Sequence, residues 1–150
     1  MATTTQFHLS FPVTDLDATE RWYVDGLGCQ RGRRSHEALV LGLGGHQLVA
    51  HLEPAALATQ RGVYPRHFGL VLAEPEELAN LEERARAQGL HFGAQPRLRY
   101  PGSPLEHRSF FLIDPSGNWL EFKHYRHREA ILGASNFQLV GEKTDPSATD

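Results

Sequence analysis

The chain has 150 residues, of which 40% are hydrophobic and 22% charged, as is typical of a globular domain. Its 15 Lys and Arg nearly balance its 18 Asp and Glu, which argues against nucleic-acid or anionic-membrane partners. No apolar run is long enough to span a bilayer, and the first residues are unlike a signal peptide, so we expect a cytoplasmic protein. The single cysteine, Cys29, excludes an internal disulfide and is interpreted as a buried structural thiol.

The first third of the chain predicts one β-α-β-β-β unit. Large apolar residues alternate through residues 7–13, which is the period of a strand. A Thr-x-x-Asp pattern then predicts the start of a helix, and a glycine its end. The elements expected here are a strand at 7–13, a helix from 14 to 26 or 28, and strands at about 29–35, 38–43 and 46–52.

The second half repeats this order. Its elements are a strand at 67–72, a helix from 74 to 89, and strands near 90–94, 109–113 and 118–125. The two units are offset by 59 residues at their first-strand histidines, His8 and His67. The sequence therefore predicts an α+β fold in a single domain over 1–150, with module one at about 6–53, module two at about 65–125 and a C-terminal extension at 126–150.

The two units differ in a proline-rich stretch, residues 95–107, which we interpret as a loop at a binding edge or as a solvated insertion. It contains Arg97, Arg99, Tyr100 and His107. The charged residues 126–129 are assigned to a helix start or a dimer contact. The polar tail from about residue 141 is predicted to be disordered.

Three side chains outline a metal site. If Phe and Leu of the strands pack under the helices, His8, His67 and Glu121 all point to the opposite, concave face. Two imidazoles and one carboxylate on one surface are a common metal-ligand set. A single strand histidine is more often a hydrogen-bonded structural residue, so the argument depends on the recurrence of histidine in both units.

The paired units, their first-strand histidines and the sequence of residues 110–122, FFLIDPSGNWLEF, resemble the vicinal oxygen chelate superfamily over about residues 6–125. That superfamily includes glyoxalase I, extradiol dioxygenases, methylmalonyl-CoA epimerase and proteins of fosfomycin and bleomycin resistance. The resemblance implies a curved, eight-stranded open barrel, a homodimer and a small-molecule substrate. It also implies a divalent metal inside the barrel, held by His8, His67 and Glu121.

The position that matches Glu121 in module one is Val49, where glyoxalase-like and epimerase-like members carry a glutamate or glutamine. Two histidines and one carboxylate hold Fe(II) with adjacent positions open, which favours an extradiol-type dioxygenase acting on a small vicinal-dioxygen substrate. One departure is Phe111, which stands where ring-cleaving enzymes have a tyrosine. If the register slips by one pair, Gln47 or His51 would complete a four-ligand site.

A four-ligand site would indicate a glyoxalase-like or epimerase-like isomerase or lyase with Mn, Zn, Ni or Co. A metal-free antibiotic-binding module is a third hypothesis. Several other polar and aromatic side chains are candidates for the chemistry. His51, His107 and Tyr125 are proposed to move protons, and Arg97, Arg99, Lys123 and Trp119 to bind substrate.

Overall fold

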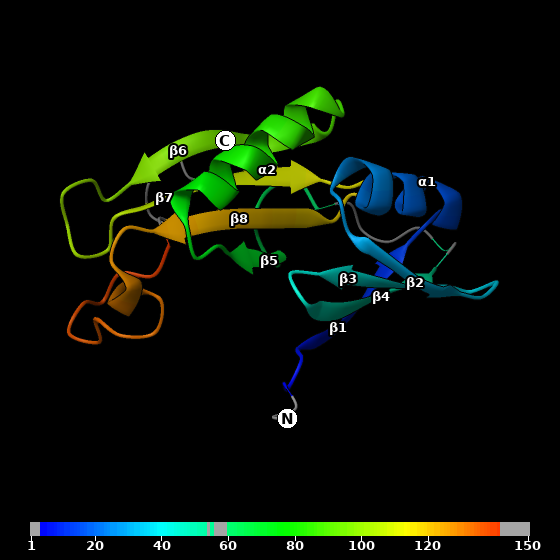
Figure 1. Ribbon diagram of the computed structural model, residues 1–150, viewed down its shortest axis with the longest axis horizontal. Helices are drawn as coiled ribbons and strands as arrows, with labels where there is room; N and C mark the ends of the chain where they lie inside the picture. The colour runs from blue at the N-terminus through cyan, green and yellow to red at the C-terminus, as the bar shows by residue number, and fades with distance from the viewer. Residues whose placement is uncertain (1–3, 54, 56–59, 142–150) are drawn as a thin grey trace.

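The computed structural model describes residues 4–53, 55 and 60–141. In this part of the chain the strands form two four-stranded sheets, in the orders β1-β4-β3-β2 and β5-β8-β7-β6 (Figure 1). In each sheet the strand that comes first in the sequence, β1 or β5, pairs in parallel with the one that comes last in the sequence, β4 or β8. The other pairs are antiparallel. The predicted pair of β-α-β-β-β units is confirmed, and we call β1–β4 module one and β5–β8 module two.

The elements of module one are β1 (His8–Val13), α1 (Leu16–Glu20), the π-helical turn η1 (Arg21–Gly26), β2 (Gln30–Arg34), β3 (Ala38–Leu43) and β4 (His46–Leu52). Those of module two are β5 (Phe68–Val71), α2 (Pro75–Ala87), β6 (His91–Arg99), β7 (His107–Ile113) and β8 (Trp119–Tyr125), followed by the 3-10 turn η2 (Arg128–Ala130).

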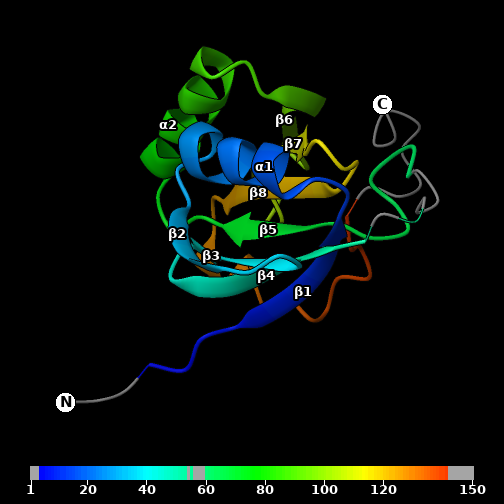
Figure 2. The same cartoon turned by 90° about the vertical axis from the view of Figure 1, so that its right-hand side faces the viewer.

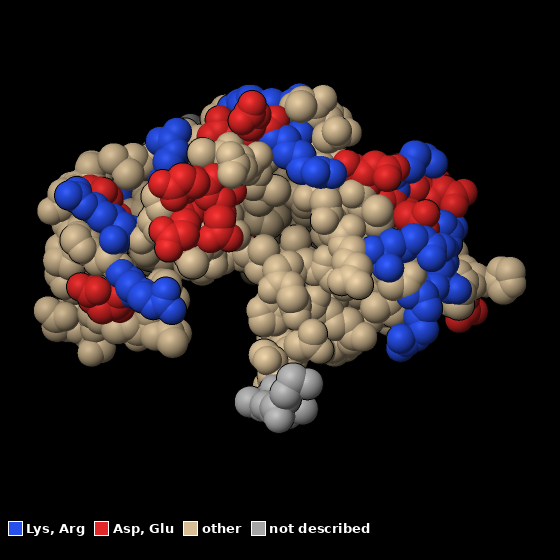
Figure 3. All heavy atoms as spheres, in the orientation of Figure 1, with Lys and Arg blue, Asp and Glu red and all other residues tan. Residues whose placement is uncertain are grey.

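Both helices lie on the same side of the sheets (Figure 2). The opposite side is curved and open, and the two sheets do not close into a barrel. Figure 3 shows the molecule hollowed on this open side, between module one and the C-terminal segment. Within the described residues, no helix is long and apolar enough to cross a membrane.

The apolar alternation of the strands builds one core that the two modules share. Phe11 and Val13 of β1 are buried, and the Phe11 ring lies 5.1 Å from that of Phe68 on β5. Cys29 belongs to the same core, and burial raises the pKa of its thiol to about 12, as expected of a structural cysteine. Because side chains alternate along a strand, His8 lies on the face opposite this core.

A buried hydrogen bond joins the modules at the turn before β8. The Tyr23 hydroxyl donates to Oδ2 of Asp114 at 2.7 Å, and the backbone N–H groups of Ser116 and Asn118 donate to Oδ1. Burial raises the pKa of Asp114, although these hydrogen bonds act in the opposite direction. The Asp-Pro-Ser-Gly sequence is therefore explained by its structural role as well as by its turn chemistry.

We expect Tyr23→Phe to lower the free energy of unfolding by about 1–3 kcal/mol, because the buried Asp114 carboxyl loses one of its hydrogen-bond donors. Urea denaturation followed by circular dichroism measures this change. An unchanged midpoint and slope would show that the bond between the modules contributes nothing to stability.

Two predicted boundaries were wrong. The N-cap of α1 is Asp15 rather than Thr14, because the Asp15 carboxylate accepts from the N–H of Ala18 at 2.9 Å. The predicted loop at 95–107 is shorter than expected and covers only residues 100–106, since β6 extends to Arg99 and β7 begins at His107. The predicted disordered tail beyond residue 141 lies outside the described residues.

Candidate metal centre

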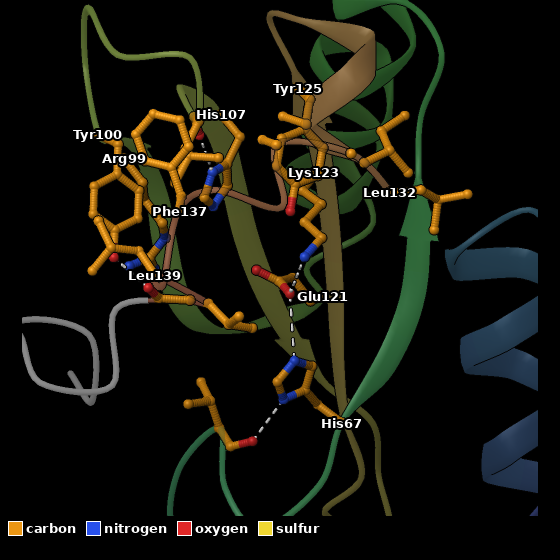
Figure 4. A pocket seen from close by; sticks show the side chains of 18 of the residues that line it. His67, Arg99, Tyr100, His107, Glu121, Lys123, Tyr125, Leu132, Phe137 and Leu139 are labelled. Carbon is orange, nitrogen blue, oxygen red and sulfur yellow. Dashed lines mark hydrogen bonds and ion pairs between the residues drawn. The ribbon is translucent and has the colours of Figure 1, made fainter.

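His67 and Glu121 face each other on the open side of module two (Figure 4). His67 immediately precedes β5, and Glu121 lies on β8, directly opposite Gly69. His67 Nε2 is 3.4 Å from Glu121 Oε1, and His67 Nδ1 is 2.7 Å from the Val63 carbonyl. A carbonyl only accepts, so Nδ1 carries a proton and the ring presents Nε2 to Glu121.

The charges around this pair keep the carboxylate ionised. Burial acts to raise the pKa of Glu121, but the hydrogen bond from His67 and the charge of Lys123 outweigh it and lower that pKa. The hydrogen bond to Glu121 in turn raises the pKa of His67. Lys123 Nζ lies 3.5 Å from Glu121 Oε1. Glu121 is therefore held as an ionised carboxylate between His67 and Lys123.

Gly69 sets the distance between β5 and β8 at this point. A Cβ added at residue 69 would lie 1.7 Å from the backbone carbonyl oxygen of Glu121. Only glycine therefore permits the approach that places Glu121 beside His67.

Module one carries a second, similar pair. His8 Nδ1 lies 2.8 Å from the side-chain oxygen of Gln47, and His8 is exposed. The register agrees with the alignment of the repeat: Leu9 pairs with Leu48 as Phe68 pairs with Leu120. Val49 is thus the counterpart of Glu121. Gln47 lies two residues earlier, on the same face of β4, and its side chain contacts His8.

One chain does not bring all three predicted ligands together. Among the described residues, no three His, Cys, Asp or Glu side chains lie close enough to hold a metal ion. His67 and Glu121 are adjacent, whereas His8 lies apart from them with Gln47.

A cavity of about 620 Å³ extends from His67 and Glu121 along the open face of module two and under residues 130–141. His107 lies on its wall, with Nδ1 2.9 Å from the Leu105 carbonyl, so that Nε2 is the free acceptor of the neutral ring. Burial lowers the pKa of His107, which keeps this ring neutral at pH 7.

A family model of the Glyoxalase/Bleomycin resistance protein/Dioxygenase superfamily matches residues 5–122. The chain belongs to this superfamily. A glyoxalase/bleomycin resistance protein/dioxygenase from Alicyclobacillus acidocaldarius is 38% identical, with a TM-score of 0.80 over 85% of this chain and 96% of that one. No curated protein matches the sequence significantly.

Two more distant superfamily structures share the fold. A lactoylglutathione lyase from Agrobacterium tumefaciens is 20% identical, with a TM-score of 0.62 over 83% of this chain and 96% of that one. The fosfomycin resistance protein FosX from Listeria monocytogenes is 17% identical, with a TM-score of 0.65 over 86% of this chain and 99% of that one.

The other predicted site residues lie in three different places. Arg99, Lys123 and Tyr125 line the large cavity with His107. Trp119 packs with Val63 and Phe111 in a small second core and borders a separate cavity of about 150 Å³. Arg97 and His51 are not among the described residues that line either cavity, and His51 is exposed on β4.

Several cavity residues were missed from the sequence. They are Leu105 and the apolar residues of the C-terminal segment, Leu132, Phe137, Leu139 and Val140. The alternation of residues 107, 109 and 111 is a usable signal for the wall formed by β7. Nothing in the composition of residues 130–141 indicates that they would cover the cavity.

Proposed function

We propose that this chain is a divalent-metal enzyme in which His67 and Glu121 are two of the metal ligands. The observation that carries the proposal is the 3.4 Å approach of His67 Nε2 to Glu121 Oε1, with the imidazole oriented by the Val63 carbonyl. Metal-binding histidines typically donate their second ring N–H to such a carbonyl. The cavity beside the pair is large enough for a small-molecule substrate.

The third ligand, His8, is proposed to come from a second copy of the chain. His8 is exposed and shares its module's open face, and it occupies the position in module one that His67 occupies in module two. A symmetric dimer that places module one of one copy against module two of the other would form two equivalent sites.

The favoured reaction is that of an Fe(II) dioxygenase acting on a small substrate with two neighbouring oxygens. Fe(II) held by two imidazoles and one carboxylate keeps adjacent positions for substrate and O2. Val49, at the position equivalent to Glu121, supports this ligand count, because valine has no donor atom. His107 would accept a proton from a substrate hydroxyl through Nε2, since its Nδ1 is already committed to Leu105.

One observation favours a second candidate, an isomerase or lyase. The side-chain oxygen of Gln47 lies at His8 and would be a fourth donor in a shared site. A four-ligand site leaves less room for O2 and suits Zn, Ni, Co or Mn with proton transfer alone.

Metal analysis and oxygen uptake separate these candidates. We expect about one iron per chain in protein purified without a chelator or a His-tag, with oxygen consumed on addition of a catechol-type substrate. His67→Ala should abolish both, and the surface variant Glu83→Ala should change neither. Zinc, nickel, cobalt or manganese with no oxygen uptake would favour the isomerase or lyase. A folded wild type that takes up no supplied metal would contradict both and leave a binding module.

A further inference from the structure

The large cavity has two kinds of wall. Within the described part of the chain, its charged lining residues all lie on strands β6 and β8 and are Arg99, Glu121 and Lys123. The C-terminal segment, residues 130–141, contributes no charged side chain to the lining. Figure 4 shows Leu132, Phe137 and Leu139 of this segment around the same cavity as Glu121. The cavity is therefore charged along the sheet and apolar along the segment.

The C-terminal segment also carries much of the exposed apolar surface. Nine large hydrophobic side chains are exposed in the described part of the chain, and five of them belong to this segment: Ile131, Leu132, Phe137, Leu139 and Val140. All five line the cavity, although Leu132 and Val140 are 96% and 92% exposed. Apolar surface gathered in this way typically marks a place where a ligand or a protein partner binds.

The loop between β6 and β7, residues 100–106, holds the chain on both sides of this apolar wall. Before the wall, the N–H of Arg126 donates to the Glu106 carbonyl at 3.0 Å. At its end, the Tyr100 hydroxyl donates to the Gly141 carbonyl. The corresponding loop of module one, between β2 and β3, is shorter. The longer loop of module two is therefore explained as the support of the segment that covers the cavity.

The size and position of the cavity favour a small molecule as its occupant. Its volume of about 620 Å³ is within the range of ligand pockets, and it is continuous with the space beside His67 and Glu121. A substrate bound at the proposed metal would therefore extend along the apolar wall. This wall lies beyond residues 5–122, which the family model matches, so we expect it to determine the specificity of this particular chain.

We propose that the substrate carries a hydrocarbon substituent, which occupies the part of the cavity lined by residues 131–140 while the substrate's two neighbouring oxygens bind at His67 and Glu121. The substituent would stabilise the complex, because it removes from water the apolar surface that this segment exposes. The inference rests on the proposed function and deepens it, because it names the substrate class as alkyl-substituted diols.

Catechol and its 4-methyl, 4-ethyl and 4-propyl derivatives test the inference by isothermal titration calorimetry under argon, which prevents oxidation. In the wild type we expect the dissociation constant to fall about 3- to 4-fold with each added methylene, as burial of a CH2 group predicts. Phe137→Ser combined with Leu139→Ser should reduce this gain to less than about 2-fold per methylene, because the substituent then lies against polar groups. The control is Leu98→Ser, which removes an exposed leucine of β6 that is not among the described lining residues and should keep the wild-type gain.

Equal dissociation constants across the series in the wild type would overturn the proposal, and so would an undiminished gain in the folded double variant. A flat series, with a double variant that elutes as a monomer in size-exclusion chromatography, would assign these residues to a contact between two copies and overturn it as well.

Each titration is repeated after EDTA treatment, which separates this inference from the proposed function. The gain per methylene should persist without metal, because the apolar wall contains no metal ligand, and its loss would overturn the proposal. Protein found to hold no metal would defeat the proposed function but leave the gain to be measured. Failure of every compound to bind to either form would overturn the proposal.

Discussion

Glu121→Gln is expected to weaken metal binding by at least about 100-fold and to reduce activity to background. Outer-shell partners of metal ligands already cost about 10–100-fold in affinity, and Glu121 is proposed to bind the metal directly. The substitution keeps the size of the side chain but replaces an anionic oxygen donor with a neutral one. It also leaves Lys123 and His67 without the carboxylate that each now contacts.

Competition titration with a chromogenic chelator measures the metal affinity, and the melting temperature of the metal-free protein reports whether the fold is intact. The matched control is Glu83→Gln on the outer surface of α2, which should keep wild-type affinity. Wild-type metal affinity in a folded Glu121→Gln variant would remove Glu121 from the ligand set.

Gly69→Ala is expected to be the most destabilising single methyl addition on the open face. The new Cβ would lie 1.7 Å from the carbonyl oxygen of Glu121, and backbone cannot move aside as a flexible side chain can. Overpacking typically costs about 1–3 kcal/mol, so we expect at least the upper end of that range. For a chain of this size, 3 kcal/mol lowers the melting temperature by roughly 6–12 °C.

Differential scanning calorimetry of the metal-free protein measures this loss. Gly89→Ala is a useful comparison, because its Cβ would meet no atom within 4 Å but its φ of 67° disfavours alanine by about 1–2 kcal/mol. A Gly69→Ala variant that is no less stable than Gly89→Ala would show that β5 and β8 can separate at little cost. Metal binding by such a variant would then show that Glu121 needs no close strand contact.

The strand faces could be predicted because they depend only on local alternation. That pattern placed His67 and Glu121 on one face, and the structure brings them within 3.4 Å. The turn glycines likewise predicted the turns between β3 and β4 and between β7 and β8, since Gly44, Gly45 and Gly117 all have the positive φ that tight turns need.

The extent of β6 could not be predicted in the same way. Pro96 and the nearby glycine and proline residues indicate a loop, but β6 is an edge strand that pairs only with β7. An edge strand tolerates proline because one side of its backbone needs no partner strand, and irregular register between Phe92 and Arg97 accommodates the local distortion. Arg99 was consequently assigned to a loop although it lies in a strand of the cavity wall.

The separation of His8 from His67 has a different origin. Local pattern determines which face each histidine occupies, but not how one module sits against the other. That arrangement depends on the shared core and on contacts such as Tyr23 with Asp114, between residues 91 positions apart in the chain. The assembly of a site from both modules is therefore a property of packing, and in our account it requires two copies of the chain.

Metal binding in mixtures of two inactive variants tests this account most directly. His8→Ala and Glu121→Ala are each expected to bind no metal tightly. After they are unfolded and refolded together in equal amounts, half of the dimers would be mixed, and each mixed dimer would have one site with every ligand intact. We predict about one quarter of the wild-type metal content and activity. The same mixture of His67→Ala and Glu121→Ala should recover nothing, because both residues belong to the same module. Tight metal binding by His8→Ala alone, or no recovery in the first mixture, would contradict a site shared between two copies.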